Sequence, residues 1–104
     1  MKRIVITGLG MINALGHNKQ SFEAIVSGEC GIDTITLCDT SELDCKIAAE
    51  VKAFDASTVM KKREQKKADR FIQLGLHAAM EAFEDASLAD VDTRSFGVVS
   101  ANCL

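Results

Sequence analysis

The sequence has no proline, no closely spaced pair of cysteines and no long apolar run. The absence of proline excludes a proline-rich linker, and no repeat or low-complexity segment marks an interior domain boundary. No apolar run approaches the roughly 18–20 residues that cross a bilayer. The opening residues, Met1 to Arg3, lead directly into a β-branched run and leave no room for a signal peptide. We therefore expect one domain at most, soluble and cytoplasmic, with no membrane partner.

The four cysteines are too far apart to form a familiar disulfide or ligand pattern. They are Cys30, Cys38, Cys45 and Cys103. Disulfide frameworks belong to secreted chains and zinc sites usually contain tight cysteine pairs, so reduced, small apolar side chains are the expected state. Cys103 is a separate case because it follows a predicted strand, where nucleophiles often lie. No candidate base comes after it.

The two histidines are expected to stand alone. His77 falls on the polar side of a predicted helix with Arg70, Gln73 and Glu81, which is typical of a solvated side chain. No group of histidine, cysteine and carboxylate, His17 included, has the spacing of a metal site or an activated nucleophile. The sequence thus predicts no metal site, no cofactor and no catalytic residue within this segment.

The net charge of −3 conceals a basic cluster. Residues 61–70 carry a local charge of +4, so the other 94 residues carry −7. Apolar spacing predicts one long helix over residues 64–86, with a face of small residues that another backbone could approach closely. Four cations would share one face at its N-terminal end, where the helix dipole disfavours them: Arg63, Lys66, Lys67 and Arg70. This placement favours docking of an acidic partner, with a solvated helix face as the alternative.

Two nucleotide-based alternatives are less favoured. The acidic remainder of the chain and the lack of aromatic residues among the basic ones argue against nucleic acid. Gly8 and Gly10 after a strand are compatible with a dinucleotide fingerprint. Its third glycine position, however, holds Asn13, so a tight strand-exit turn is the preferred interpretation.

The remaining pattern predicts short, alternating elements around an aperiodic loop at residues 29–45. These are a buried strand at 4–6, a helix from an Asn18 cap to Gly28, a half-exposed strand at 46–51, a short helix from Asp55 to Met60 and a second buried strand at 96–99. The order is typical of an α/β layered fold. Two buried strands cannot cover each other's edges, so the segment does not predict a closed domain.

Several stretches together resemble the N-terminal segment of β-ketoacyl-acyl-carrier-protein synthases, the type II condensing enzymes. They are KRIVITGLGMI at 2–12, FEAIVSG at 22–28, KIAAEV at 46–51, KREQKKADRFIQ at 62–73 and DASL at 85–88. The resemblance covers nearly the whole chain but only about the first quarter of such an enzyme. It implies a partial thiolase-like fold, with α-β-α-β-α layers in the full family, and a homodimer.

The resemblance also implies decarboxylative Claisen condensation of acyl groups with malonyl-acyl carrier protein in fatty acid biosynthesis. The family's nucleophilic cysteine, two histidines and lysine lie beyond residue 104, so no catalytic role passes to this chain. What does carry over is docking of the acyl carrier protein by Arg63, Lys66 and Lys67, and no cofactor is implied. We expect the 104-residue chain alone to be inactive.

Three departures from the family pattern leave other interpretations open. Asn13 and Ala14 replace the usual Thr-Pro, and Ser87 occupies a predicted left-handed position where glycine is usual. Residues 101–104 replace the expected glycine-rich turn. The alternatives are a truncated, non-catalytic carrier-protein-binding fragment, a decayed gene product, or part of a polyketide ketosynthase.

Overall fold

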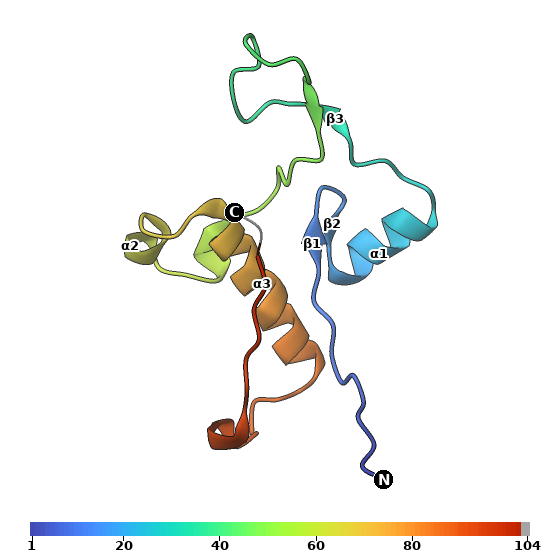
Figure 1. The fold of residues 1–104 in the computed structure, drawn as a ribbon, viewed down its shortest axis with the longest axis vertical. Helices are drawn as coiled ribbons and strands as arrows, with labels where there is room; N and C mark the ends of the chain where they lie inside the picture. The colour runs from blue at the N-terminus through green and yellow to red at the C-terminus, as the bar shows by residue number, and fades with distance from the viewer. Residues whose placement is uncertain (103–104) are drawn as a thin grey trace.

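The computed structural model describes residues 1–102 and shows a small, mixed arrangement of helices and short strands (Figure 1). Its elements follow in the order β1 Ile12–Asn13, β2 Gly16–His17, α1 Asn18–Val26, β3 Asp33–Thr34, β4 Ile47–Ala48, η1 Ala56–Thr58, α2 Lys62–Gln65, α3 Arg70–Asp85 and η2 Thr93–Ser95. The two sheets are both two-stranded hairpins, β1–β2 and β3–β4. This is an α/β segment, as the sequence predicted. None of the described helices is long and apolar enough to cross a membrane.

Helix α3 is the central element, and the chain before β1 lies against its small-residue face. A Cβ atom built on Gly8 or Gly10 would fall within 3.0 Å of α3 backbone atoms, at Ala82 and Ala86 or at Ala78 and Ala82. The Leu9 N–H donates to Asp85 Oδ2 at 2.9 Å and fixes this approach. The small face therefore admits a neighbouring backbone, as predicted. The predicted turn at Gly8 and Gly10 is wrong, because the glycines serve close packing in a stretch with no turn.

The predicted buried strands at 4–6 and 96–99 are not strands in the structure. Both segments lie outside any hydrogen-bonded ladder. Their apolar side chains are exposed, with Ile4 at 97% and Val99 at 100%. A strand is held by hydrogen bonds to a neighbour, and no segment within residues 1–102 pairs with either one. High β-propensity therefore produced extended backbone without a sheet.

The predicted continuous helix over residues 64–86 is interrupted. Helix α2 ends at Gln65, and α3 begins at Arg70 after the extended residue Asp69. Gln73 stabilises the break, because its Nε2 donates to the carbonyl oxygens of Ala68 at 2.9 Å and Gln65 at 3.3 Å. Carbonyl groups at a helix end need such partners, so a side chain on α3 closes the end of α2.

The predicted strand at 46–51 and short helix after Asp55 are confirmed in part, because the strand spans only Ile47–Ala48, with Ile47 58% exposed, and the helix is a 3₁₀ helix over Ala56–Thr58. Thr34 pairs with Ile47 across β3–β4, within the predicted strand at 46–51. Asp55 caps η1 by accepting from the Ser57 N–H at 2.8 Å. Residues 29–45 are mostly loop, as predicted.

The predicted start of helix α1 differs from the structure, whereas its predicted end does not. The predicted Asn18 cap is wrong by one position, because Asn18 is the first residue of the helix and follows His17. Gly28, at φ 83°, ends the helix in the left-handed conformation, as predicted. The apolar side chains of this helix, Phe22 among them at 61%, remain exposed.

The chain has almost no buried core. Ala24 and Ala56 are the buried apolar residues among those described, and no residue of α3 is fully buried. The radius of gyration is 16.6 Å, whereas a compact domain of this length has about 13 Å. The accessible surface is 8838 Å², against roughly 5700 Å² for a folded monomer of this mass. The structure agrees with the prediction that these elements do not close a domain.

Candidate functional site

The basic cluster lies on α2 and the turn that follows it. Arg63 belongs to α2, Lys66 follows its last residue and Lys67 lies in the turn. All three side chains are exposed, and none forms an ion pair or hydrogen bond with residues 1–102. Three positive charges are therefore presented to solvent over a short stretch of chain.

Arg70 does not belong with these three residues. Its Nη2 donates to the Val51 carbonyl oxygen at 2.7 Å, and its guanidinium lies 5.1 Å from the centre of the Phe54 ring. It thereby links α3 to the chain after the β3–β4 hairpin. The prediction that four cations share one helix face is wrong, because the helix breaks between Gln65 and Arg70.

The break also weakens the dipole argument for Lys66 and Lys67. Both follow α2, a helix of only four residues, and precede Asp69, the N-cap of α3, so neither lies in the first turn of the long helix, where its dipole acts. Their placement needs no functional explanation on that ground. Their exposure and lack of partners remain the observations that bear on docking.

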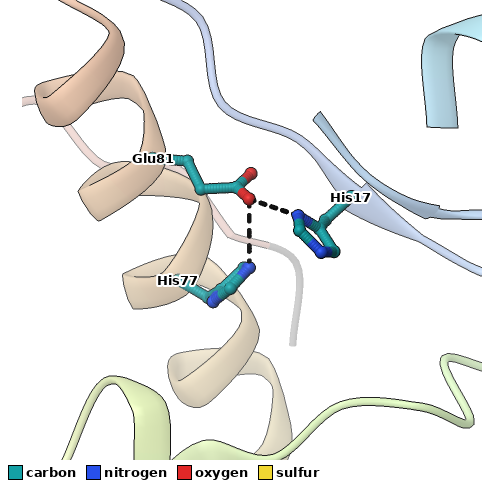
Figure 2. Close-up of side chains that lie close together, drawn as sticks. All are labelled: His17, His77 and Glu81. Carbon is teal, nitrogen blue, oxygen red and sulfur yellow. Dashed lines mark hydrogen bonds and ion pairs between the residues drawn. The ribbon is translucent and has the colours of Figure 1, made fainter. Parts of the chain in front are cut away.

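A second site joins β2 to α3 through His17, His77 and Glu81 (Figure 2). His17 Nδ1 lies 2.5 Å from Glu81 Oε1, and His77 Nε2 lies 3.4 Å from the same oxygen. His77 and Glu81 are one helical turn apart on α3, and His17 comes from the hairpin beside it. One candidate ligand atom from each residue lies within 4.8 Å of the other two.

Burial differs sharply within this histidine–glutamate cluster. The His17 side chain is 56% exposed, whereas those of His77 and Glu81 are 16% and 14% exposed. The His77 ring meets the rings of Phe54 and His17 edge to face, each at 5.4 Å between centroids. The predictions that the histidines stand alone and that His77 is solvated are therefore wrong.

Part of this cluster could have been found from the sequence. His77 and Glu81 are four residues apart in a strongly periodic helix, so they lie on one face. No local pattern indicated that His17 would meet them, because its approach depends on the packing of residues 8–10 against α3. The meeting of His17 with the pair on α3 is therefore a product of tertiary structure.

The cysteines contribute no such cluster in the described chain. Cys30, Cys38 and Cys45 are exposed free thiols. Cys103, singled out as a possible nucleophile, lies outside the described residues.

Comparison with known proteins accounts for the whole chain. Residues 1–104 match the family model "Beta-ketoacyl synthase, N-terminal domain". The chain is similar to proteins named 3-oxoacyl-[acyl-carrier-protein] synthase 2. It is 38% identical to the Vibrio cholerae protein, over 84% of this chain and 21% of the relative. It is also 38% identical to the Coxiella burnetii protein, over 90% of this chain and 23% of the relative. The Staphylococcus aureus protein is 40% identical, over 84% of this chain and 21% of the relative.

These matches also define how much of the family the chain represents. It spans about a fifth of the length of the curated relatives it matches. The small nucleotide-binding domain considered from Gly8 and Gly10 finds no support in this result. The resemblance read from the residues is confirmed: the chain belongs to the β-ketoacyl synthase N-terminal domain family.

Proposed function

We propose that this chain is the N-terminal part of a cytoplasmic 3-oxoacyl-[acyl-carrier-protein] synthase of fatty acid biosynthesis. The whole protein would catalyse the decarboxylative condensation of acyl groups with malonyl-acyl carrier protein. It would have the thiolase fold and act as a homodimer. The observation that carries the proposal is the family match over all 104 residues, together with relatives that share this name.

The open architecture is consistent with a part of a larger enzyme. Helix α3 carries exposed apolar side chains at Phe71, Ile72 and Leu76, at 43%, 44% and 37%. The extended segments 4–6 and 96–99 offer unpaired ladder groups. Both features are expected to be buried against other protein segments, since exposed apolar surface and unpaired strand edges favour association with another chain or segment. The remainder of a synthase is the proposed cover.

The part played by this segment would be to dock the acyl carrier protein. Arg63, Lys66 and Lys67 form the proposed docking surface, because they are exposed and have no anionic partner in the described chain. Glu64, which lies among them, already accepts a hydrogen bond from the Lys61 N–H at 3.1 Å. A charge not already paired within its own chain is available to attract an acidic protein and to speed its approach.

Charge reversal tests this surface. We expect Lys66→Glu and Lys67→Glu together, in the protein or a full-length relative, to slow association with acyl carrier protein by roughly tenfold at low salt. The loss should shrink as salt rises, since the Debye length falls to about 8 Å at physiological ionic strength. Stopped-flow association kinetics across a salt series would measure both effects. Reaction with small acyl thioesters that lack the carrier should stay nearly unchanged.

Lys2 and Arg3 provide the matched control. They are exposed and equally basic but precede the segment that packs on α3. Reversing them should leave carrier association unaltered. If Lys66→Glu and Lys67→Glu bind the carrier as fast as the parent protein at low salt, the docking surface is a solvated face and this assignment fails. The family membership would be untouched by that result.

A further inference from the structure

We propose that His17, His77 and Glu81 form a binding site for a divalent transition-metal ion of the zinc type. The site lies between β2 and α3, apart from the docking surface on α2, and it rests on geometry alone. Its success or failure is independent of the proposed synthase activity.

The donor set suits such an ion. Two imidazole nitrogens and one carboxylate oxygen are ligands that zinc accepts, with a fourth position left to water or another group. The pair on α3 is spaced by four residues, so both side chains project from one face of a rigid helix. Figure 2 shows the Glu81 carboxylate directed between the two imidazole rings.

One of the three ligand separations already suits such an ion, and a second must lengthen. Ligand atoms around a tetrahedral zinc ion are separated by about 3.3 Å, given metal–ligand bonds near 2.0–2.1 Å. His77 Nε2 and Glu81 Oε1 already lie 3.4 Å apart. His17 Nδ1 and Glu81 Oε1 are closer, at 2.5 Å, because they share a hydrogen bond. The His17 ring is 56% exposed, so it has room to turn aside and admit an ion.

Unsatisfied atoms supply a second, independent observation. Glu81 Oε2 and His77 Nε2 are both buried without a hydrogen-bond partner in the described structure. Buried polar atoms of native proteins nearly always have partners, so these two atoms call for an explanation. A cation bound by His77 Nε2 and by the Glu81 carboxylate would give the imidazole nitrogen a partner, and bidentate binding by the carboxylate would give Oε2 a partner as well.

The surroundings provide shelter and access. Phe54 covers one side of the His77 ring, and a low-dielectric wall strengthens the attraction between a carboxylate and a cation. A cavity of about 220 Å³ is bordered by Glu81 and His77, and another of about 370 Å³ by His17. Each cavity offers a route by which an ion could reach the three side chains.

The competing arrangement is a hydrogen-bonded clasp that holds no ion. In that case Glu81 would simply bridge His17 and His77 and tie the hairpin to α3. The two arrangements make opposite predictions for zinc binding, so one titration distinguishes them.

The unmodified protein gives the most direct test. Its only two histidines are both in the cluster, so every imidazole resonance reports on the site. We expect one equivalent of Zn²⁺ to shift the ring ¹⁵N signals of both histidines together. Mg²⁺, which prefers oxygen ligands, should shift neither at the same concentration. Unshifted signals at saturating zinc would establish the clasp and overturn the proposal.

Variants then assign the ligands. Glu81→Gln and His17→Asn should each weaken Zn²⁺ binding by at least about tenfold in chelator-competition titrations, the scale expected for a disturbed metal site. Glu42→Gln is the control, since it removes the same charge from an exposed position in the loop at residues 29–45 and borders neither cavity beside the cluster. His17→Asn also guards against misfolding, because its side chain is more than half exposed.

The cysteines need separate exclusion, because thiolates bind zinc well. The titration is therefore repeated with all four cysteines changed to serine. Retained one-to-one binding in this background supports the site, and lost binding assigns the zinc to thiols. Equal affinity of Glu81→Gln and Glu42→Gln would likewise overturn the proposal.

Discussion

Two regions of this chain are held in place in different ways. Residues 8–17 lie against α3 through close backbone approach at Gly8 and Gly10, with two polar links, from Leu9 and from His17 to α3. The β3–β4 hairpin instead projects away from the other elements (Figure 1). Besides its short ladder and the ion pair between Lys52 and Asp33, it is held by the Glu50 carboxylate. This group accepts hydrogen bonds from the backbone N–H groups of Thr36 and Leu37 and from the Thr36 hydroxyl, all at 2.9–3.0 Å.

The difference shows what replaces a core in each region. The segment before β1 can approach the backbone of α3 because its glycines have no side chains. A larger residue at either glycine should therefore lower the stability of this contact most. In the hairpin, the charged Glu50 carboxylate accepts hydrogen bonds from backbone N–H groups of the loop. Neutralising this one charge should therefore destabilise the hairpin most. Stability in the first region depends on shape, and in the second on charge and pH.

The largest effect is expected from Gly10→Ala. The added Cβ would lie 2.7 Å from the Ala82 nitrogen and 2.9 Å from the Ala78 carbonyl carbon, and helix backbone cannot yield easily. We expect a loss of about 1–3 kcal/mol in the free energy of unfolding, the usual cost of overpacking. Urea denaturation followed by circular dichroism would measure it. Amide exchange at Leu9 should accelerate, because its bond to Asp85 would be lost.

Gly75→Ala is the matched control for that substitution. Gly75 lies inside α3, and a Cβ there meets nothing within 4 Å. Alanine is the better helix former by about 0.8–1.0 kcal/mol, so this variant should be more stable than the parent. If Gly10→Ala and Gly75→Ala change stability in the same direction, the close approach of residues 8–10 to α3 does not hold.

The sequence predicted helices and caps better than strands because their causes are local. Apolar spacing located α3, and Asp55 was identified as a cap because its acceptor lies two residues from the donor. A strand depends on a partner that the local pattern does not supply. Val98 and Val99 have strong β-propensity, yet they stay unpaired within the described chain.

The same limit explains the candidate sites. The basic residues were found from the local charge of residues 61–70 and from the family resemblance, but the placement of four of them on one helix face was wrong. The side chain of Gln73, eight residues from Gln65, stabilises a break that periodicity could not indicate. The histidine–glutamate cluster was missed because His17 and Glu81 are 64 residues apart in sequence. Only the folded chain brings them together.

A smaller effect is expected at the end of α3, where Ser87 has a φ of 53°. The prediction of a left-handed residue here is confirmed, and an L-residue in this conformation costs about 1–2 kcal/mol. Glycine removes that cost but loses more backbone entropy on folding, by about 0.5–1 kcal/mol. We expect Ser87→Gly to raise the free energy of unfolding by about 0.5 kcal/mol, measured by urea denaturation. Ser87→Ala, which keeps a Cβ at the same φ, should give no such gain.

Protonation of Glu50 should have the smallest effect on the stability of the whole chain. Its titration is nevertheless the sharpest test of what supports the hairpin. Hydrogen bonds from the backbone N–H of Leu37, and then of Thr36, lower the pKa of this carboxyl from its ordinary value, against the opposing effect of desolvation. The ionised form is therefore favoured in the folded hairpin. Its stabilising contribution is fully present above the unfolded pKa of about 4.3 and is lost as pH falls through the lower folded value.

Amide resonances provide the measurement. In an acid titration, the Thr36 and Leu37 N–H signals should move together, with a midpoint below the ordinary glutamate value, as their acceptor is protonated. In Glu50→Gln this transition should vanish, and both signals should resemble the acid form at neutral pH. Glu42→Gln is the control, because Glu42 is exposed in the same loop and accepts no hydrogen bond from the described residues. A transition that survives in Glu50→Gln would assign the hairpin's pH dependence to another group and leave the β3–β4 hairpin without its proposed charge-based support.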